Sequence, residues 1–373
     1  MASASDHQNM SRAIELARKG RYTTRPNPSV GCVIVQGDQV VGEGYHERAG
    51  EPHAEVHALA MAGSQAKGAT AYVTLEPCSH FGRTPPCAEA LIKAGVAEVV
   101  VGMQDPNPQV AGRGIRMLEE KGVVTRVGVM EAEVRTLNPG FIKRMQTGRP
   151  YVRAKLAMSL DGRTAMASGE SQWITGPQAR SEVQSLRALS GAIVTGVGSI
   201  LHDNSSLTLR ENELNLPEAE ALVQNQPLRV VLDSSLRTPV DAKVITGPGQ
   251  VMIFCSVQAD KARKRALEEA GAEVLMLDSH DGRINLEQML EILITKDIND
   301  VLLETGATLA GAMMEQGLVD ELVVFMAPVL MGSSARPLMD MPFATMAEKL
   351  NLNITDIRAV GNDWKITAFP NND

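Results

Sequence analysis

The chain has 373 residues, of which 44% are hydrophobic and 21% are charged, and its formal net charge at pH 7 is -8. This length exceeds the size at which a single hydrophobic core stops growing, so two domains are expected. The acidic balance and the absence of a dense Lys/Arg cluster argue against nucleic-acid binding as the main task, because phosphate contacts supply most of such affinity.

The N-terminal residues 1–20 are polar and then amphipathic, without the apolar segment of a signal peptide. No apolar run in the sequence approaches the ~20 residues that a bilayer span requires. Four cysteines in a chain of this length fit a reducing compartment better than a disulfide framework. We therefore expect a cytoplasmic protein that does not enter a membrane.

In chain order, the first block of predicted elements alternates helices with strands. It comprises helices at residues 10–19, 53–66, 87–94 and 114–121 and strands at 30–35, 40–45, 73–75, 98–103 and 123–129. Pro52 suits the first turn of the second helix, which places His53 and Glu55 at the start of that helix. The alternation predicts an α/β sandwich layered about one sheet.

A domain boundary follows a helix-like stretch at residues 131–145, where the sequence reads Thr147-Gly148-Arg149-Pro150. We therefore expect domains at residues 1–147 and 148–373. The second block contains predicted helices at 177–189, 259–270, 286–296 and 308–316 and strands at 151–158, 192–195, 228–233, 251–255, 273–277, 301–304, 321–331, 354–360 and 364–369. This pattern predicts a second, complete α/β domain.

Three soft or borderline ligands and one carboxylate stand close together in the first block. His53, Cys78 and Cys87 suit a catalytic zinc, which takes three protein ligands and leaves a fourth position for water. Zinc lowers the pKa of that water, and Glu55 could carry its proton to a leaving amine. H-x-E followed by P-C-x-x-C is typical of zinc deaminases, although eight residues separate the two cysteines here.

Two other zinc sites are compatible with parts of this pattern. A closed structural site would use His57 or His80 as a fourth ligand, but it would give Glu55 no role. A metalloprotease site of the H-E-x-x-H type is disfavoured, because its glutamate directly follows the first histidine, whereas Glu55 stands two positions after His53.

Three motifs carry a family resemblance: Asn27-Pro28-Ser29-Val30-Gly31-Cys32, His53-Ala54-Glu55 and Pro77-Cys78-Ser79-His80-Phe81-Gly82-Arg83-Thr84-Pro85-Pro86-Cys87. They resemble the deaminase half of the bifunctional riboflavin biosynthesis (RibD) family, which shares this wide cysteine spacing. The resemblance implies a cytidine-deaminase-like three-layer α/β/α domain, zinc on His53, Cys78 and Cys87, and Glu55 as the proton shuttle. It also implies a substrate pocket lined by Asn27, His46, Arg83 and Asn107.

The second block lacks the G-x-G-x-x-G fingerprint of many dinucleotide sites. Instead, two predicted strands run into glycine-containing turns before helices, at residues 196–199 and 305–312. Backbone N–H groups and a helix end at such turns can hold phosphates. Two turns of this kind in one domain indicate a nucleotide site.

The resemblance continues through residues 155–165 and 171–175, which look like the reductase domain of the same family and imply a dihydrofolate-reductase-like α/β fold that binds NADPH. The implied cofactor contacts are Ala157, Trp173, Ser199, Asp203, Ser234, Gly306, Ala307, Thr308, Leu309, Ala310, Gly311 and Ala312. The implied substrate contacts are Lys155, Ser171, Arg187, Leu207, Arg210 and Glu304. Guanidinium groups suit phosphate geometry, so Arg187 and Arg210 are candidate clamps on a ribose 5-phosphate.

The resemblance implies two successive reactions on a phosphorylated pyrimidine. The first is zinc-dependent deamination of 2,5-diamino-6-(5-phosphoribosylamino)pyrimidin-4(3H)-one, and the second is NADPH-dependent reduction of the ribosyl group of 5-amino-6-(5-phosphoribosylamino)uracil. Proton delivery in the second step has three candidates, Lys155, Asp203 and Glu304. We also expect a homo-oligomer, either a dimer or a tetramer.

Three other classes of protein remain open from the residues. They are a deaminase of nucleic-acid bases, a zinc deaminase of another nucleotide with a regulatory nucleotide-binding C-terminal domain, and a zinc scaffold without catalysis. The first would need a basic face or stacking aromatic residues, and aromatic residues make up only 3% of this chain.

Overall fold

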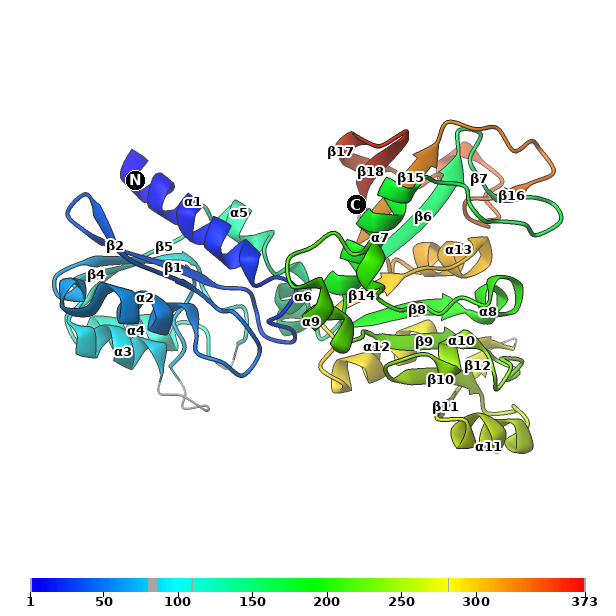
Figure 1. Ribbon diagram of the computed structural model, residues 1–373, viewed down its shortest axis with the longest axis horizontal. Helices are drawn as coiled ribbons and strands as arrows, with labels where there is room; N and C mark the ends of the chain where they lie inside the picture. Colours follow the sequence, from blue (N-terminus) through cyan, green and yellow to red (C-terminus); the bar gives the residue numbers. More distant parts are fainter. Residues whose placement is uncertain (1, 80–85, 109, 281, 372–373) are drawn as a thin grey trace. The chain divides into compact units, whose positions relative to one another are not determined.

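The computed structural model describes residues 2–79, 86–108, 110–280 and 282–371 (Figure 1). The chain forms two compact units, Met1–Gly148 and Arg149–Asp373. Each unit has its own sheet and its own hydrophobic core. Among the described helices, none combines the length and the apolar character that a membrane span requires.

The first unit is built on a five-stranded sheet with the strand order β2-β1-β3-β4-β5. Its strands are β1 (Gly31–Gln36), β2 (Gln39–Tyr45), β3 (Thr70–Leu75), β4 (Glu98–Met103) and β5 (Val124–Val127). β1 and β2 form an antiparallel hairpin, β1 also runs antiparallel to β3, and β3, β4 and β5 are parallel. The carboxyl ends of β3 and β4 therefore lie at the same edge of the sheet.

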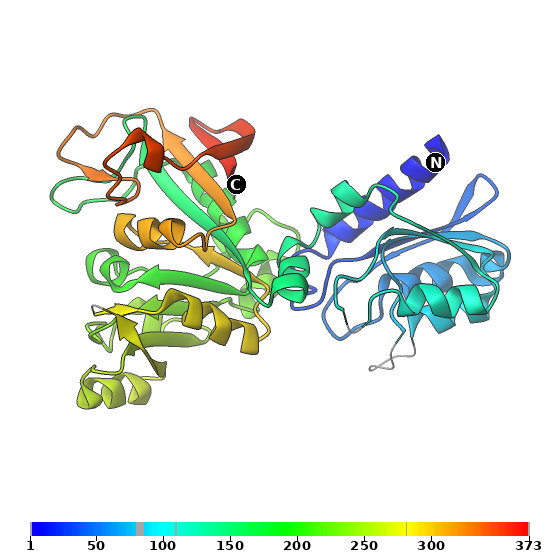
Figure 2. The same ribbon diagram turned by 180° about the vertical axis from the view of Figure 1, so that it is seen from behind.

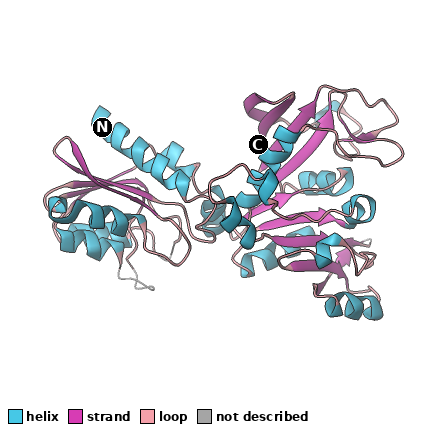
Figure 3. Ribbon diagram, viewed as in Figure 1, coloured by secondary structure: helices cyan, strands magenta, loops and turns pink. Residues whose placement is uncertain are grey.

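Helices cover both faces of this sheet (Figures 1 and 3). One face carries α2 (Ala54–Ala62), α3 (Cys87–Ala94) and α4 (Arg113–Glu120), and the other carries α1 (Ala4–Lys19), α5 (Glu131–Arg135) and α6 (Pro139–Thr147). Alternate residues of β1 serve the two cores: Cys32 and Ile34 pack toward α2, whereas Val33 and Val35 pack toward α1. The expected three-layer α/β/α fold is confirmed.

Two helix predictions in this unit were wrong at their ends or in their continuity. α1 begins at Ala4 instead of residue 10, because Ser3 and Asp6 form a capping box. The Ser3 hydroxyl accepts from the Asp6 backbone N–H, and the Asp6 carboxylate accepts from the Ser3 backbone N–H. The single helix expected at residues 131–145 is two helices, and the second begins at Pro139, where proline is tolerated as a first residue but would interrupt a continuing helix.

The second unit is built on a nine-stranded sheet with the order β11-β10-β9-β8-β14-β6-β15-β18-β17. Its strands are β6 (Tyr151–Ser159), β8 (Ala192–Gly196), β9 (Leu228–Leu232), β10 (Val251–Ser256), β11 (Glu273–Leu277), β14 (Asp300–Leu303), β15 (Glu321–Ala327), β17 (Leu352–Val360) and β18 (Asp363–Pro370). All neighbouring pairs from β11 to β15 are parallel, and β18 and β17 add an antiparallel edge.

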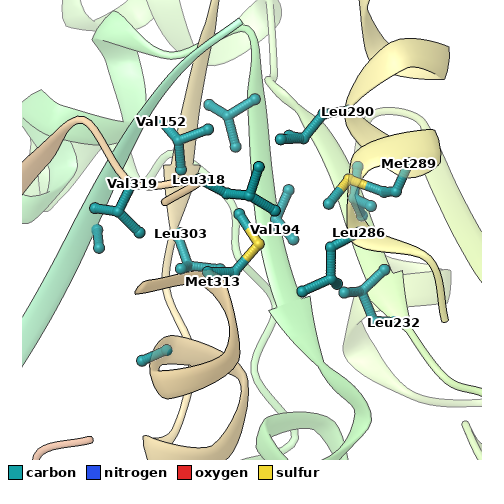
Figure 4. Close-up of a cluster of buried hydrophobic side chains, with 14 of the residues drawn as sticks. Val152, Val194, Leu232, Leu286, Met289, Leu290, Leu303, Met313, Leu318 and Val319 are labelled. Atoms are coloured by element: carbon teal, nitrogen blue, oxygen red, sulfur yellow. The ribbon is translucent and has the colours of Figure 1, made fainter. Parts of the chain in front are cut away.

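Helices again cover both faces of the sheet (Figure 2). α12 (Leu286–Thr295) and α13 (Ala307–Glu315) pack on one face, where Figure 4 shows Met289, Leu290 and Met313 against side chains of the central strands. The other face carries α7 (Pro177–Leu189), α8 (Val197–Asp203), α10 (Lys243–Thr246) and α11 (Lys261–Glu269). Both faces of the parallel strands are buried, which explains their nearly continuous apolar sequences.

Short elements complete the second unit. They are β7 (Arg163–Ala165), β16 (Arg336–Pro337), β12 (Ser279–His280), β13 (Arg283–Ile284), α9 (Ala219–Gln224) and the 3-10 helices η2 (Glu211–Glu213) and η3 (Met346–Glu348); η1 (Gly63–Ala66) belongs to the first unit. The strand predicted at residues 321–331 ends at Ala327, before Pro328, which has no N–H for the ladder. The β7–β16 pair was not predicted, because each strand is too short to show a period.

A carboxylate on α1 fastens this helix to the far strands of the first sheet. Asp6 is 4% exposed and accepts two hydrogen bonds of 2.8 Å from the Arg126 guanidinium, which also donates to Glu98 at 2.6 Å. The Tyr72 hydroxyl donates to Asp6 at 3.0 Å. These contacts, with Arg126 first among them, hold the pKa of Asp6 well below its usual range.

We expect Asp6→Asn to lower the free energy of unfolding of the first unit by roughly 1–2 kcal/mol at pH 7, because Arg126 is partly exposed and solvent weakens the pair. The pKa of Asp6 is depressed in the folded state, so its contribution is present above the unfolded pKa of about 3.9 and is lost as pH falls. Urea unfolding followed by far-UV circular dichroism at pH 7 and pH 3 measures both effects.

The two tryptophans provide the control for this measurement. Trp173 and Trp364 both lie in the second unit, so tryptophan fluorescence follows that unit alone. Its unfolding midpoint should be the same in Asp6→Asn and the wild type. An equal loss of stability at pH 3 and pH 7 would contradict the role given to the Asp6 charge.

Candidate active sites

Close packing between the backbones of β2 and α2 positions the start of α2, which carries the predicted zinc ligand His53. β2 carries Gly42 and Gly44 where the helix crosses it, and a Cβ on either glycine would collide with the carbonyl oxygen of Ala58 or Ala54. His53 is the N-cap residue of α2, so Pro52 lies just before the cap and not in the first turn as predicted. Glu55 then falls in the first turn, next to the positive end of the helix.

His53, Cys78 and Cys87 come together as a group of metal-ligand atoms. The Nδ1 atom of His53 lies 3.3 Å from the Cys87 sulfur and 3.6 Å from the Cys78 sulfur. Two ligands of a tetrahedral zinc, one nitrogen at ~2.05 Å and one sulfur at ~2.3 Å, are about 3.6 Å apart. The two measured distances are close to this value, so His53, Cys78 and Cys87 suit a tetrahedral zinc.

The local structure also favours the thiolate form of Cys78, which binds cations. Cys78 follows the end of β3, and Cys87 is the first residue of α3. The Cys87 backbone N–H donates to the Cys78 sulfur at 3.2 Å. The Cys87 thiol and this N–H lower the pKa of Cys78, which favours the thiolate that zinc binds.

Glu55 lies beside these ligands but is not one of the grouped metal-ligand atoms within the described part of the chain. Its side chain is buried, and burial, reinforced by the charge of Cys78, raises its pKa to about 7. A carboxyl group with such a pKa can both accept and donate a proton near neutral pH. His57, the proposed fourth ligand of a closed site, is also outside the group, and His80 lies outside the described residues.

Two of the predicted substrate contacts adjoin the metal group. The rings of His46 and His53 meet edge to face, with centroids 5.3 Å apart. The Asn27 amide nitrogen lies 3.3 Å from Nε2 of His46, whose Nδ1 lies 3.2 Å from the Pro52 carbonyl oxygen. Asn27 itself is exposed and can turn its amide toward a ligand. Arg83 lies outside the described residues.

Glu76, which sequence reasoning missed, fixes the loop that carries Asn107. Its buried carboxylate accepts hydrogen bonds from the backbone N–H groups of Asp105, Gly112, Gly114 and Ile115, at 2.9 to 3.3 Å. A Cβ on Gly114 would collide with the carbonyl oxygen of Pro77, so the start of α4 packs directly against the Pro77-Cys78 backbone. The only sequence signal is a carboxylate at a strand end, because its donors are 29 to 39 residues away.

A cleft of about 700 Å³ lies in the second unit, at the carboxyl ends of β6, β8, β9 and β14. This edge is where ligands bind in open parallel sheets. Most of the predicted reductase contacts line the cleft: Lys155, Ala157, Ser171, Arg187, Ser199, Asp203, Leu207, Ser234, Glu304, Gly306, Ala307, Thr308, Leu309 and Ala312. Thr164 and His202 also line it and were not predicted.

The cleft contains features that fit a dinucleotide. No atom of the described residues lies within 4 Å of a Cβ built on Gly198 or Gly306, so the backbone at both strand-to-helix turns is open to a ligand. No side chain caps α13 at Gly306, which leaves the start of that helix available to a phosphate. The volume, the open glycines and the helix end together suit NADPH.

A buried charge cluster occupies one end of the cleft. The Arg187 guanidinium donates to both carboxylate oxygens of Glu304, at 2.6 and 2.9 Å, and to the Thr208 carbonyl oxygen at 2.8 Å. Burial would raise the pKa of Glu304, but the charges of Arg187 and Lys155 outweigh it and lower that pKa. Burial lowers the pKa of Lys155. Glu304 is therefore an ionised carboxylate between two basic groups.

Two of the predicted lining residues form an ordered pair, and the four remaining predicted contacts lie away from the lining. The Ser171 hydroxyl donates to Asp203 at 2.9 Å. Trp173 is 63% exposed and stacks with the Arg180 guanidinium, and Arg210 forms an ion pair of 2.9 Å with Glu213. Ala310 faces the core, and Gly311 lies against the backbone of Asp340. These four do not line the cleft.

Both units are similar to known protein families. Residues 3–103 match the model of the cytidine and deoxycytidylate deaminase zinc-binding region, and residues 150–366 match the RibD C-terminal domain. The chain is 53% identical to the riboflavin biosynthesis protein RibD of Escherichia coli, over 96% of this chain and 97% of that protein. The chain belongs to the RibD family.

Other relatives agree with this assignment. The RibD of Haemophilus influenzae is 45% identical over 99% of this chain and 98% of its own length. The solved structure of Acinetobacter baumannii RibD is 47% identical, with a TM-score of 0.91 over 99% of both chains. A solved deaminase/reductase from Thermotoga maritima is 31% identical, with a TM-score of 0.85 over 98% of this chain and 99% of that chain.

Membership in the RibD family decides among the classes left open by the sequence. RibD proteins are bifunctional enzymes of riboflavin biosynthesis that combine a zinc-dependent deaminase with an NADPH-dependent reductase, and this chain has both activities. It acts on a small molecule. A regulatory C-terminal domain is not favoured, because residues 150–366 match the RibD C-terminal domain. The dihydrofolate-reductase-like expectation for that unit is confirmed with it.

We expect Glu76→Gln to lower deaminase kcat/KM at least about tenfold, because an amide N–H would face backbone N–H donors and two charge-assisted bonds would be lost. Ammonia release from the purified full chain measures this effect. Reductase activity, supplied with the deaminated substrate, should stay at the wild-type level and is the control. Unchanged deamination would mean that the loop at residues 105–115 does not need Glu76.

Proposed function

We propose that residues 1–147 form the deaminase domain and residues 148–373 the reductase domain. The first would hydrolyse the ring amine of 2,5-diamino-6-(5-phosphoribosylamino)pyrimidin-4(3H)-one, and the second would reduce 5-amino-6-(5-phosphoribosylamino)uracil. The observation that carries the proposal is the zinc-ligand group with a buried, unligated Glu55, in a chain that also holds a dinucleotide-sized cleft. The solved relative from Thermotoga maritima is a diaminohydroxyphosphoribosylaminopyrimidine deaminase and 5-amino-6-(5-phosphoribosylamino)uracil reductase, which supports these substrates.

In the deaminase, we assign zinc ligation to His53, Cys78 and Cys87, and bound zinc supplies an activated water. Glu55 takes the proton of the attacking water and delivers it to the departing amine. Its burial suits this role, since a pKa of about 7 makes both transfers accessible. Asn27 and His46 orient the pyrimidine beside His53, with Asn107 on the loop held by Glu76 and Arg83 in the segment between the cysteines.

In the reductase, NADPH supplies the hydride that reaches the ribosyl C1'. Breaking the C1'–O4' bond places a negative charge on O4', which must receive a proton. We assign this proton to Lys155: burial lowers its pKa, whereas Glu304 is held ionised by Arg187 and has no proton to give. Arg187, Arg210, Ser171 and Leu207 remain the proposed substrate contacts.

The remaining reductase residues belong to the cofactor. Their place in the cleft lining, together with the open backbone at Gly306, supports contacts to NADPH from Ala157, Ser199, Asp203, Ser234, Gly306, Ala307, Thr308, Leu309 and Ala312. Trp173, Ala310 and Gly311 lie outside the cleft lining, and we assign them to the cofactor site through contacts or packing beside the cleft.

The decisive experiment follows ammonia release and NADPH absorbance together after the diaminopyrimidine phosphate is added to the purified protein. NADPH consumption should begin only after ammonia appears. Glu55→Gln should abolish both signals while the metal content stays near one zinc per chain, because Glu55 is not a ligand. Loss of zinc in Glu55→Gln would make Glu55 a ligand, and NADPH oxidation without ammonia release would contradict the reaction order.

A second prediction isolates the proton donor of the reductase. Lys155→Met should lower reduction of the deaminated substrate by about 100-fold or more, since general acid catalysis contributes factors of that size. NADPH binding, measured by fluorescence, and deamination should be retained. Lys155→Arg keeps the charge but cannot release a proton near neutral pH, so it should be equally defective. An active Lys155→Arg enzyme would show that charge, not proton transfer, is what Lys155 supplies.

We also propose that the enzyme works in the cytoplasm as a homo-oligomer, a dimer or a tetramer. None of its four cysteines forms a disulfide, which suits a reducing compartment. β17 and β18 expose a group of apolar side chains, Leu352, Ile354, Ile357 and Trp364, of the kind that protein interfaces cover.

A further inference from the structure

The cationic side chains of the reductase cleft are not equivalent. Four arginines line it: Arg187, Arg237, Arg283 and Arg336. Arg187 is neutralised by Glu304. Arg237, Arg283 and Arg336 are exposed, and their side chains form no ion pair or hydrogen bond with another described residue. Unpaired guanidinium groups in one cleft indicate a second site for negative charge.

The order of the strands gives this cleft two ends. Lys155 comes from β6, and Glu304 follows the neighbouring strand β14. Beyond β14 the order continues to β8 and β9. Three strand spacings of about 4.8 Å separate β6 from β9, roughly 14 Å in all, a span that suits an extended dinucleotide. The Lys155 end and the β9 end therefore serve opposite ends of the cofactor.

Arg237 belongs to the β9 end. It stands in the turn after β9, three residues beyond Ser234, which also lines the cleft. The turn is held rigidly, because Asp233 accepts from both the backbone N–H and the hydroxyl of Thr238, each at 2.7 Å. Arg263 of α11 donates to the turn carbonyls of Leu236 and Thr238, at 3.0 and 2.9 Å. The Arg237 side chain thus projects from a fixed backbone.

Arg283 reaches the same end from another element. It is the first residue of β13, which contacts β10, the strand next to β9. The following residue, Ile284, is buried in the core and anchors the strand. Arg336, in contrast, pairs through β16 with β7 and lies beside Gly169, on the β6 side. Of the four arginines, only Arg237 and Arg283 lie beyond β8.

The cofactor must lie along this cleft in one direction. Hydride transfer requires contact between the nicotinamide and the substrate, so the nicotinamide lies at the end with Lys155, Arg187 and Glu304. The pyrophosphate then meets the uncapped start of α13 at Gly306. The adenosine and its 2'-phosphate extend beyond β8, toward the turn after β9. NADPH differs from NADH only by this phosphate.

We propose that Arg237 and Arg283 bind the 2'-phosphate of NADPH, assisted by the Ser234 hydroxyl, and make the enzyme prefer NADPH to NADH. Guanidinium groups bind phosphate with paired hydrogen bonds and are always charged. Their side chains have no partner among the described residues, so these hydrogen bonds are available to the ligand. The proposal rests on the assignment of this cleft as the NADPH site.

The test measures binding instead of turnover. NADPH and NADH are titrated separately into the full-length protein, and their fluorescence gives the two dissociation constants for the wild type, Arg237→Gln, Arg283→Gln and the double variant. Each single change should weaken NADPH binding about tenfold, or about 1.4 kcal/mol. NADH binding should stay within about twofold, so the preference for NADPH should collapse in the double variant. Both arginines are exposed, so the variants should fold.

Arg336→Gln is the matched control, because it removes an arginine from the other end of the cleft and should leave the ratio of the two constants unchanged. Adenosine 2'-phosphate should displace NADPH from the wild type better than adenosine 5'-phosphate does, and this advantage should vanish in the double variant. Equal weakening of NADPH and NADH, or no weakening, would overturn the proposal. A wild-type protein that binds neither cofactor would instead overturn the assignment of the cleft.

Discussion

Parallel pairing of strands is the constraint on which both sites depend, because it brings the carboxyl ends of neighbouring strands to one edge of a sheet. In the first unit, the ends of β3 and β4 bring Glu76 and Cys78 to the loop at residues 105–112. In the second unit, the ends of β6, β8, β9 and β14 form the cleft. Reversing any one of these strands would move its polar residues to the opposite edge.

Three buried carboxylates lie in or beside the two sites, and their surroundings differ. Glu76 is surrounded by four backbone N–H groups and only positions a loop. Glu304 is held ionised by the bidentate contact with Arg187. Glu55 has no such partner, and its raised pKa leaves it able to carry a proton. The partners of a carboxylate, more than its burial, therefore decide whether it is structural or reactive.

Each described site is complete within its own compact unit. The zinc-ligand group comes from Met1–Gly148, and every residue that lines the reductase cleft comes from Arg149–Asp373. The two reactions therefore draw on separate sets of side chains, and a change in one set can be compared with the other activity in the same molecule. The deaminated pyrimidine is the chemical link between the two sites.

The sequence by itself determined the zinc site, the alternation of helices and strands and the family, because these depend on short motifs and local periods. His53 and Glu55 share one helical turn, and Cys87 begins a helix that was predicted with its observed bounds at residues 87–94. Only the tertiary structure decided that Glu76 holds the loop at residues 105–115 and that Arg187 neutralises Glu304, 117 residues away. It also showed that, of the four arginines that line one cleft, only Arg187 is paired with a carboxylate of the described residues. Such contacts depend on strand order, and no local pattern in the sequence specifies which strands become neighbours.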